Sequence, residues 1–477
     1  MPAPFHVSMI AAASIAVATN ARAALPLAPS GPDAPAGESA APAAVESGAD
    51  AWFLGSIVSG VPTTGTNTFG DAVSVSGRRI AIGAYNTPCP APLAGRCGDA
   101  YVYDYAPGPA PTRYHVPSPN PSAGAGYGVS VAIDGDWLLV GAPDEHRGAG
   151  YFAGNVYLFH FVDGNWNAVP LQTPDEAGAL LGQSVAVSAS GLAVAGMPHQ
   201  SRTSPPALTN NGAVATFVRD AAGEWSYEGI VRAATPASNA YFGSAVGLHA
   251  YVLPPGILDG YGIAVGAPGT SVLGQPNAGE GYAYTRGRDD LQWTSAGFFN
   301  LGAAAHSGAR FGAAAAIDGA LVAFGVPGRI KALDAPAAGS VVFARRSGAD
   351  WSTYAADEVY GTQQEGAAFG SAIALQGDDA FIGAPAFAFS ASGNGQVQQF
   401  HHATGTPEHW DYVAYILEYY PNEDAHFGAS LALDGTYLAI GSPGSPLFGQ
   451  PPESDRVGMA YVYRADAIFE GGFDGVE

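Results

Sequence analysis

The chain is poor in charged residues, and above all in basic ones. Charged residues make up 12% of the 477 positions, and 18 Lys and Arg stand against 41 Asp and Glu. That charged fraction is about half of what is usual in soluble proteins. The formal charge of −23 would be repelled by phosphate backbones and by anionic lipid surfaces. We therefore expect no nucleic-acid partner.

Cysteine is almost absent, with only Cys89 and Cys97 in the stretch TPCPAPLAGRCGD. An even count at close spacing in an exported chain favours a disulfide between the two. Two thiolates alone make a poor metal site, so metal binding is the weaker alternative. We expect a Cys89–Cys97 bridge, and no cofactor or metal.

Long hydrophobic runs are also missing. The apolar run Met9–Ala18 is too short to span a bilayer, and the Ala-Arg-Ala sequence at Ala21–Ala23 fits a small-residue cleavage site. We predict a signal peptide at residues 1–23, although the usual basic segment is lacking; the alternative is an apolar N-terminal tail. We expect no membrane span, and a secreted, extracellular or cell-surface location, with the periplasm as an alternative.

One segment near the N-terminus has too few large apolar side chains to offset the entropy of ordering. Residues 24–50 are mostly Ala, Pro, Gly, Ser and acid, so we predict a disordered linker there. Residues 467–477 form a short Phe, Gly and acid tail. The intervening residues 51–466 are expected to fold.

Glycine and proline are abundant, with 65 and 37 copies, and they mark an internal repeat. A Phe-Gly-like pair and a Gly-Ala-Pro-like triplet recur seven times with a period of about 60 residues. The first element stands at Phe69-Gly70, Tyr127-Gly128, Leu181-Gly182, Phe242-Gly243, Phe311-Gly312, Phe369-Gly370 and Phe427-Gly428. The second begins at Gly83, Gly141, Gly196, Gly266, Gly325, Gly383 and Gly441, and the fourth copy has an insertion between its two elements.

Each copy is predicted to form four short strands. Val129–Ile133 alternates in polarity as a strand does, Asp134-Gly135 predicts a tight hairpin turn, and Trp137–Gly141 predicts the second strand. A variable loop, a third strand and a fourth strand that begins near an aromatic residue follow. Seven such antiparallel sheets are too many for one flat sheet. Radial packing as a seven-bladed β-propeller would bury their apolar faces, and a β-solenoid is the weaker alternative.

The seventh copy lacks a fourth strand, since it ends after Met459–Asp466. The segment Ala51–Ser59 resembles the fourth strands of the other copies. We predict that it completes the last blade and so removes an open sheet edge.

The paired motifs resemble the FG-GAP repeat of integrin α-subunit propellers and of many secreted bacterial proteins. The resemblance covers residues 51–466 and implies an all-β seven-bladed propeller with a binding or adhesion role. One feature departs from the family. Its calcium loop needs several oxygens between the first two strands, whereas here this connection is as short as AIDGDW. Structural calcium is therefore not expected.

No catalytic motif is present. The chain has no G-x-S-x-G elbow, no H-E-x-x-H and no phosphate-binding glycine loop. We expect a monomeric, non-enzymatic propeller that recognises an extracellular protein or glycan. The alternatives are a glycosidase or lyase acting on polysaccharide, and a scaffold without a ligand.

Recognition is expected on the end of the propeller that carries the long second-to-third loops and the links between blades. Solvated loops without a ligand are the competing interpretation for each polar residue there. The candidate ligand-binding residues are Asp144, Glu145, His146, Arg147, His199, Arg329, Lys331, Glu423, Asp424 and His426.

Overall fold

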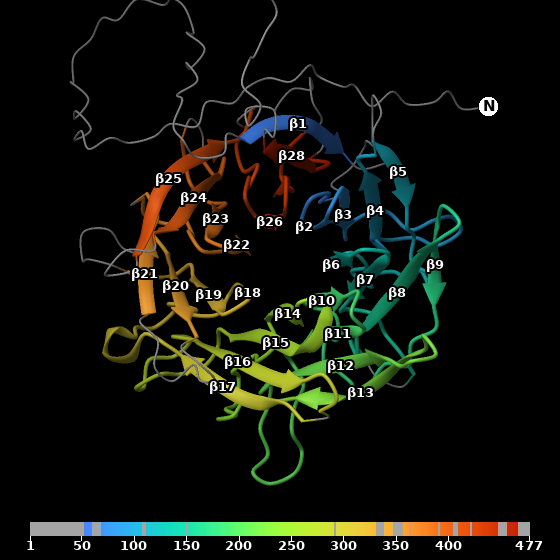
Figure 1. Ribbon diagram of the computed structural model, residues 1–477, viewed down its shortest axis with the longest axis horizontal. Helices are drawn as coiled ribbons and strands as arrows, with labels where there is room; N and C mark the ends of the chain where they lie inside the picture. Colours follow the sequence, from blue (N-terminus) through green and yellow to red (C-terminus); the bar gives the residue numbers. More distant parts are fainter. Residues whose placement is uncertain are drawn as a thin grey trace, which may run out of the picture.

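The computed structural model describes residues 52–59, 68–106, 111–148, 151–290, 292–330, 338–346, 356–362, 364–389, 392–403, 409–419, 422–446 and 456–465. The predicted signal peptide, linker and C-terminal tail lie outside these residues, as does Lys331. The described strands form seven four-stranded antiparallel sheets, arranged radially around a centre (Figure 1). The seven-bladed β-propeller is confirmed.

The blades are numbered here in chain order, each running from its innermost to its outermost strand. Blade 1 holds β2 (Ala72–Ser76), β3 (Arg79–Ala84), β4 (Asp99–Asp104) and β5 (Thr112–His115). Blade 2 holds β6 (Ser130–Asp134), β7 (Trp137–Ala142), β8 (Asn155–Val162) and β9 (Asn165–Val169). Blade 3 holds β10 (Val185–Ser188), β11 (Leu192–Met197), β12 (Ala213–Arg219) and β13 (Trp225–Val231).

Blade 4 holds β14 (Ala245–Leu253), β15 (Ile257–Ala267), β16 (Glu280–Gly287) and β17 (Thr294–Phe299), followed by the 3₁₀ turn η1 (Gly302–Ala304). Blade 5 holds β18 (Ala315–Asp318), β19 (Leu321–Val326), β20 (Ser340–Arg345) and β21 (Ala356–Tyr360). Blade 6 holds β22 (Ala372–Gln376), β23 (Asp379–Ala384), β24 (Gln396–Ala403) and β25 (His409–Leu417). Blade 7 holds β26 (Ser430–Asp434), β27 (Tyr437–Ser442), β28 (Met459–Ala465) and β1 (Trp52–Ser59).

The N-terminal strand closes the ring. β1 pairs antiparallel with β28, with Val58 opposite Ala460 and Ser59 opposite Met459. In Figure 1 the blue β1 accordingly lies beside the red β28. The prediction that this segment completes the last blade is confirmed.

The two glycines of each repeat make close backbone contacts within a blade and between neighbouring blades. Within a blade, the N–H of the Phe-Gly glycine donates to the carbonyl of the Gly-Ala-Pro glycine, as Gly128 does to Gly141 at 2.9 Å. Between blades, the Gly141 Cα lies directly under the carbonyl oxygen of Gly182, so an added Cβ would clash with it. The same contact recurs seven times around the ring. The pairs are Gly83–Gly128, Gly141–Gly182, Gly196–Gly243, Gly266–Gly312, Gly325–Gly370, Gly383–Gly428 and Gly441–Gly70.

The large apolar residue of each Phe-Gly-like pair is part of the core. All seven residues at this position, including Phe69, Tyr127 and Leu181, are 0% exposed. Full burial of such a side chain contributes roughly 1.5–3 kcal/mol. Seven buried apolar clusters form, one at each blade interface, and the last joins Val58 and Val462 of blade 7 to Phe69 of blade 1.

The short first turns also join neighbouring blades. The Asp at the end of an inner strand accepts a hydrogen bond from a backbone N–H in the turn of an adjacent blade. This contact was not predicted, because each turn was interpreted as an isolated hairpin. Asp434 accepts from Gly77 at 2.5 Å, Asp134 from Ala189 at 2.7 Å and Asp318 from Gly377 at 2.6 Å. These bonds add a second ring of contacts on the face that carries the turns.

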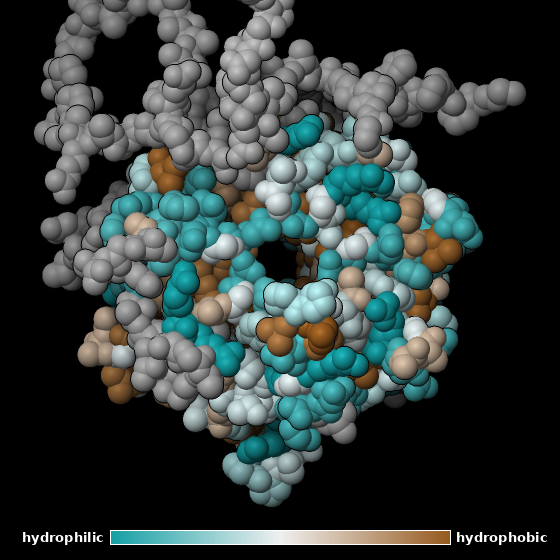
Figure 2. Space-filling model, viewed as in Figure 1, coloured by the Kyte–Doolittle hydropathy of each residue, from teal (hydrophilic) through white to brown (hydrophobic). Residues whose placement is uncertain are grey.

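The insertion in the fourth copy lengthens one hairpin. β14 and β15 continue past their neighbours, and their tip exposes Val252, Leu253 and Ile257. Figure 2 shows a central opening in the disc, with apolar surface on its rim where Figure 1 places β14 and β15. Cys89 and Cys97 are joined in the second-to-third loop of blade 1, which confirms the predicted disulfide. Among the described residues, no helix is long and apolar enough to cross a membrane.

Candidate functional site

Strand direction separates two faces of the disc. Because each blade is antiparallel, the first-to-second and third-to-fourth turns share one face, and the second-to-third loops share the other with the links between blades. Backbone hydrogen bonds join the members of the second set: Leu180 in a link donates to Phe152 in a loop at 3.2 Å, and Asp144 donates to Ala125 at 3.1 Å. We call this second side the loop face.

A pocket of about 510 Å³ lies on the loop face where the inner strands of blades 3, 4 and 5 begin. We call it the mouth pocket, because Gln183, Ser244 and Ala313 in its wall lie one or two residues before the inner strands that surround the central opening. The polar and aromatic side chains that line it are Gln183, His199, Tyr241, Ser244, Asn277 and Arg310.

Two residues in this wall have a left-handed backbone. Tyr241 has φ of 55° and Arg310 has φ of 59°, and each directly precedes its Phe-Gly pair. This conformation costs an L-residue other than Gly roughly 1–2 kcal/mol. The residue before the Phe-Gly-like pair has this conformation in every blade. In the other five blades this residue is Thr68, Gly126, Leu180, Ala368 or His426. The fold thus imposes the conformation on all seven blades, and the side chain carried there is free to vary.

An aromatic pair forms one wall of the pocket. The Tyr241 ring lies against the Cα of Gly269, where any added Cβ would clash with the ring. His199 contacts Tyr241 with ring centroids 5.1 Å apart. Burial lowers the pKa of His199, and the carboxylate of Asp144 partly opposes that shift. His199 is therefore mainly neutral at pH 7.

Arg310 brings an unneutralised charge to the same pocket. Its side chain is exposed, and within the described part of the chain its guanidinium has no hydrogen-bond acceptor and no carboxylate partner. A guanidinium offers five N–H donors in a planar fork that matches carboxylates and other planar anions. The pocket can therefore hold an anionic or hydrogen-bonding group beside an aromatic surface.

Blades 1 and 2 place carboxylates near the mouth, at Asp71, which follows its Phe-Gly pair, and at Asp144, which follows its Gly-Ala-Pro triplet. Burial raises the pKa of the part-exposed Asp71 to about 6. Burial also raises the pKa of Tyr85, and the charges of Asp71 and Asp144 raise it further. The pKa of Asp144 is raised by burial and lowered in part by His146 and His199. Around the opening, the loop face thus changes from acidic in blades 1 and 2 to aromatic and then basic in blades 3 to 5.

Several predicted ligand-binding residues have partners inside the protein. Glu145 is 1% exposed and accepts hydrogen bonds from Tyr157 at 2.7 Å and Asn155 at 3.2 Å. Arg329 pairs with Glu358, with Nε 2.6 Å from Oε1. These contacts hold loops to strands, so Glu145 and Arg329 serve the scaffold in this structure.

The other predicted residues are spread over the loop face. Asp144 and His199 lie at the mouth. His146 is exposed and contacts Phe152, with ring centroids 4.6 Å apart, while Arg147 lies at the rim and is described below. On the far side of the ring, Asp424 pairs with Arg456 at 3.2 Å, and Glu423 and His426 are exposed. Among the predicted residues that the structure describes, Asp144 and His146 of blade 2 lie near His199 of blade 3, and their role in binding stays a prediction.

Sequence reasoning missed Asp71, Tyr241 and Arg310. A usable signal was present, since Tyr241 and Arg310 directly precede a Phe-Gly pair and Asp71 directly follows one. Comparing these two positions across the seven copies would have shown which blades place charged or aromatic side chains at the mouth. The search for dense polar clusters selected loop residues such as Glu145 instead.

The comparison with known proteins agrees with this architecture. Residues 118–159 match the family model of the FG-GAP repeat, a span that holds the Phe-Gly-like and Gly-Ala-Pro elements of blade 2. No curated protein matches the chain. Among the described residues, no group of three or more His, Cys, Asp or Glu is placed to hold a metal ion. The chain is a seven-bladed β-propeller that carries an FG-GAP repeat.

Proposed function

We propose that the protein is a secreted binding propeller that holds an extracellular protein or glycan at the mouth pocket and catalyses no reaction itself. A propeller with FG-GAP character is suited to binding or scaffolding. The predicted signal peptide and the disulfide between Cys89 and Cys97 support export. The loops of a rigid scaffold are where recognition usually resides.

One observation carries the proposal. Tyr241 and Arg310 project from strained left-handed positions at the wall of a 510 Å³ pocket. Neither side chain belongs to a blade-interface core, and Gly or Asn would suit that backbone better. All seven blades share this backbone conformation, so what distinguishes blades 4 and 5 is the pair of side chains that they place in the pocket. A ligand with an acidic group beside an apolar face fits the Arg310 and Tyr241 pair.

A second candidate function rests on Asp71. A carboxyl group with a pKa of about 6 can donate or accept a proton near neutral pH. Asp144, whose pKa is also raised, approaches the same tyrosine, Tyr85. This arrangement would suit a glycosidase or lyase acting on polysaccharide. A hydrolase and lyase panel on the purified mature chain tests it: turnover that Asp71→Asn abolishes would favour the enzyme over the binder.

The binding proposal is tested by finding a ligand and then replacing the two left-handed residues in the wall of the mouth pocket. The mature chain is applied to a glycan array and to an array of extracellular proteins, and affinities for each hit are measured with Tyr241→Gly and Arg310→Gly. Both variants should lose at least about tenfold in affinity. Both should also keep or raise the melting temperature, because glycine adopts the left-handed conformation without strain.

Ala368→Gly is the matched control, since Ala368 has the same conformation in blade 6, away from the pocket. It should raise or preserve stability and leave affinity unchanged. The proposal fails if no ligand is found on either array, or if the affinity of every hit is unaffected by both pocket variants. A loss of affinity accompanied by a loss of stability would instead indicate a structural role for these residues.

A further inference from the structure

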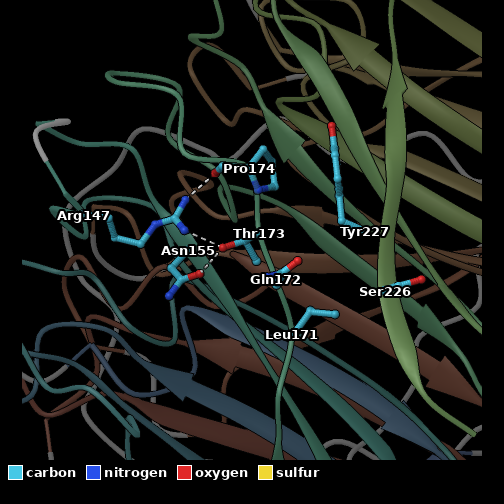
Figure 3. A pocket seen from close by; sticks show the side chains of 8 residues that line it. All are labelled: Arg147, Asn155, Leu171, Gln172, Thr173, Pro174, Ser226 and Tyr227. Atoms are coloured by element: carbon cyan, nitrogen blue, oxygen red, sulfur yellow. Dashed lines mark hydrogen bonds between the residues drawn. The ribbon is translucent and has the colours of Figure 1, made fainter.

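A second depression lies at the rim of the disc, between blades 2 and 3. It is a groove of about 530 Å³, within the size range of small-molecule sites. Figure 3 shows its two walls: the segment Leu171–Pro174, which follows β9, and the residues Ser226 and Tyr227 on β13. β9 ends at Val169, and the segment that follows it forms the wall that faces β13. We call this depression the rim groove.

One wall of the rim groove holds a rigid cation. Arg147 donates from Nε to the Gly154 carbonyl at 2.8 Å, from Nη1 to Thr173 Oγ1 at 2.6 Å, and from Nη2 to the Pro174 carbonyl. Thr173 Oγ1 in turn donates to Asn155 Oδ1 at 2.9 Å (Figure 3). The guanidinium is therefore oriented before any ligand arrives, which reduces the entropy cost of binding.

All three acceptors of Arg147 are neutral. Within the part of the chain that the structure describes, no carboxylate forms an ion pair with it, although the protein carries 41 acidic residues. The nearby carboxylate of Glu145 is hydrogen-bonded by Tyr157 and Asn155. Two of the five guanidinium N–H groups stay available. Asp175, beside Gly148, and Glu176, whose charge acts on Tyr227, also lie near the groove, but within the described residues neither forms an ion pair with Arg147. The guanidinium therefore stays oriented and without a carboxylate partner.

The opposite wall is aromatic and polar. Tyr227 is 37% exposed, and its ring leans on Phe217 with centroids 5.8 Å apart. In Figure 3 the Tyr227 side chain lies across the groove from Arg147 and Thr173. Gln172 and Ser226 are exposed, and among the described residues neither side chain has an internal hydrogen-bond partner. An aromatic face beside free amide and hydroxyl groups is complementary to a sugar ring, which has apolar C–H faces and a hydroxylated edge.

We propose that the rim groove binds a saccharide that carries carboxylate groups, with a carboxylate on Arg147 and the sugar ring against Tyr227. The two N–H groups that Arg147 leaves unused can donate to a carboxylate, and such charge-assisted hydrogen bonds are stronger than neutral ones. The amide of Gln172 and the hydroxyl of Ser226 then pair with sugar hydroxyls. This site shares no residue with the mouth pocket and does not depend on the function proposed for it.

The test uses the mature full chain, with tetragalacturonate as the acidic probe and galactotetraose as its neutral counterpart, in isothermal titration calorimetry. Tetragalacturonate should bind at least about tenfold more tightly than galactotetraose, and added salt should reduce the difference. Arg147→Gln should remove most of the preference for the acidic probe. Tyr227→Ala and Gln172→Ala should weaken both probes, and neither exposed side chain is needed for folding.

Phe298→Ala is the matched control, because Phe298 is an aromatic residue 59% exposed on β17, the outer strand of blade 4. It should leave both affinities unchanged. The same titrations repeated in the Arg310→Gly background remove any contribution of the mouth pocket to binding of the acidic probe. The proposal is overturned if tetragalacturonate does not bind at about 10 mM, if the two probes bind equally, or if Tyr227→Ala and Gln172→Ala change nothing. Loss of the mouth ligand in Arg310→Gly with intact tetragalacturonate binding would separate the two sites.

Discussion

The Cα of Gly441, in the last blade, packs against the carbonyl oxygen of Gly70, in the first. The contact is the same one that joins every other pair of neighbouring blades. It brings residues near the two ends of the folded part of the chain into van der Waals contact. The ring therefore closes with its own repeating contact, in addition to the pairing of β1 with β28.

Replacing Gly441 by alanine should destabilise the protein by about 2–3 kcal/mol, because the added methyl group collides with backbone atoms that cannot rotate away. Gly229→Ala is the control: Gly229 lies in β13, and nothing lies within 4 Å of its added Cβ. The free energy of unfolding of the Gly229→Ala variant should stay within about 0.5 kcal/mol of that of the parent. Urea unfolding measures both. Equal stability of the two variants would show that the glycine contact does not tighten the ring.

Removing β1 should destabilise the protein by several kcal/mol. A chain that begins at residue 60 loses the outermost strand of blade 7, which buries Leu54 and Val58 and pairs along the whole of β28. A chain that begins at residue 50 keeps the strand and should melt like the full mature protein. Differential scanning calorimetry compares the two. The same melting temperature for both would contradict closure by this strand.

Asp71→Asn should stabilise the protein at pH 7. The folded pKa of Asp71, about 6, lies above its ordinary value of 3.8, so the folded state binds the proton more tightly than the unfolded state does. Stability therefore falls as the pH rises from about 4 to about 6, and the ionised carboxylate costs stability above that range. Because the side chain is part-exposed, we expect a gain of about 1–2 kcal/mol.

The Asp71→Asn variant should also show a flatter dependence of stability on pH between about 4 and 6 than the parent. Asp163→Asn, at an exposed turn between β8 and β9, is the control and should leave the profile unchanged. Urea unfolding across this pH range gives the answer. A variant that is less stable than the parent at pH 7 would mean that the ionised carboxylate is stabilised in the folded state.

Calcium should not change the stability of the protein. The turns between the first two strands are two residues long in most blades, as between Asp134 and Trp137, and cannot surround an ion. A binding ion would stabilise the folded state in proportion to its concentration over its Kd. We expect the same melting temperature in calcium chloride and in chelator. A rise of many degrees with calcium would point to an ion-binding site formed in the folded chain.

Much of the architecture was predictable from local sequence. Period-two polarity, Asp-Gly turns and seven regularly spaced motifs define short antiparallel strands, and repetition leaves few ways to bury their faces. Even ring closure could be inferred, because Ala51–Ser59 resembles an outer strand and blade 7 lacked one. Strand formation and strand count depend on neighbouring residues, so the sequence carries them directly.

The candidate site was not predictable in the same way. Glu145, Arg147 and His146 are near-consecutive in the chain, yet one is buried with Tyr157, one is held by Thr173 at the rim, and one is exposed on the loop face. Which side chains share a pocket depends on the direction of each loop after it leaves its strand. The mouth pocket joins Tyr241 and Arg310, which lie 69 positions apart. The sequence alone determined the blades and the glycines between them, whereas tertiary structure alone decided which charges found partners and which stayed free.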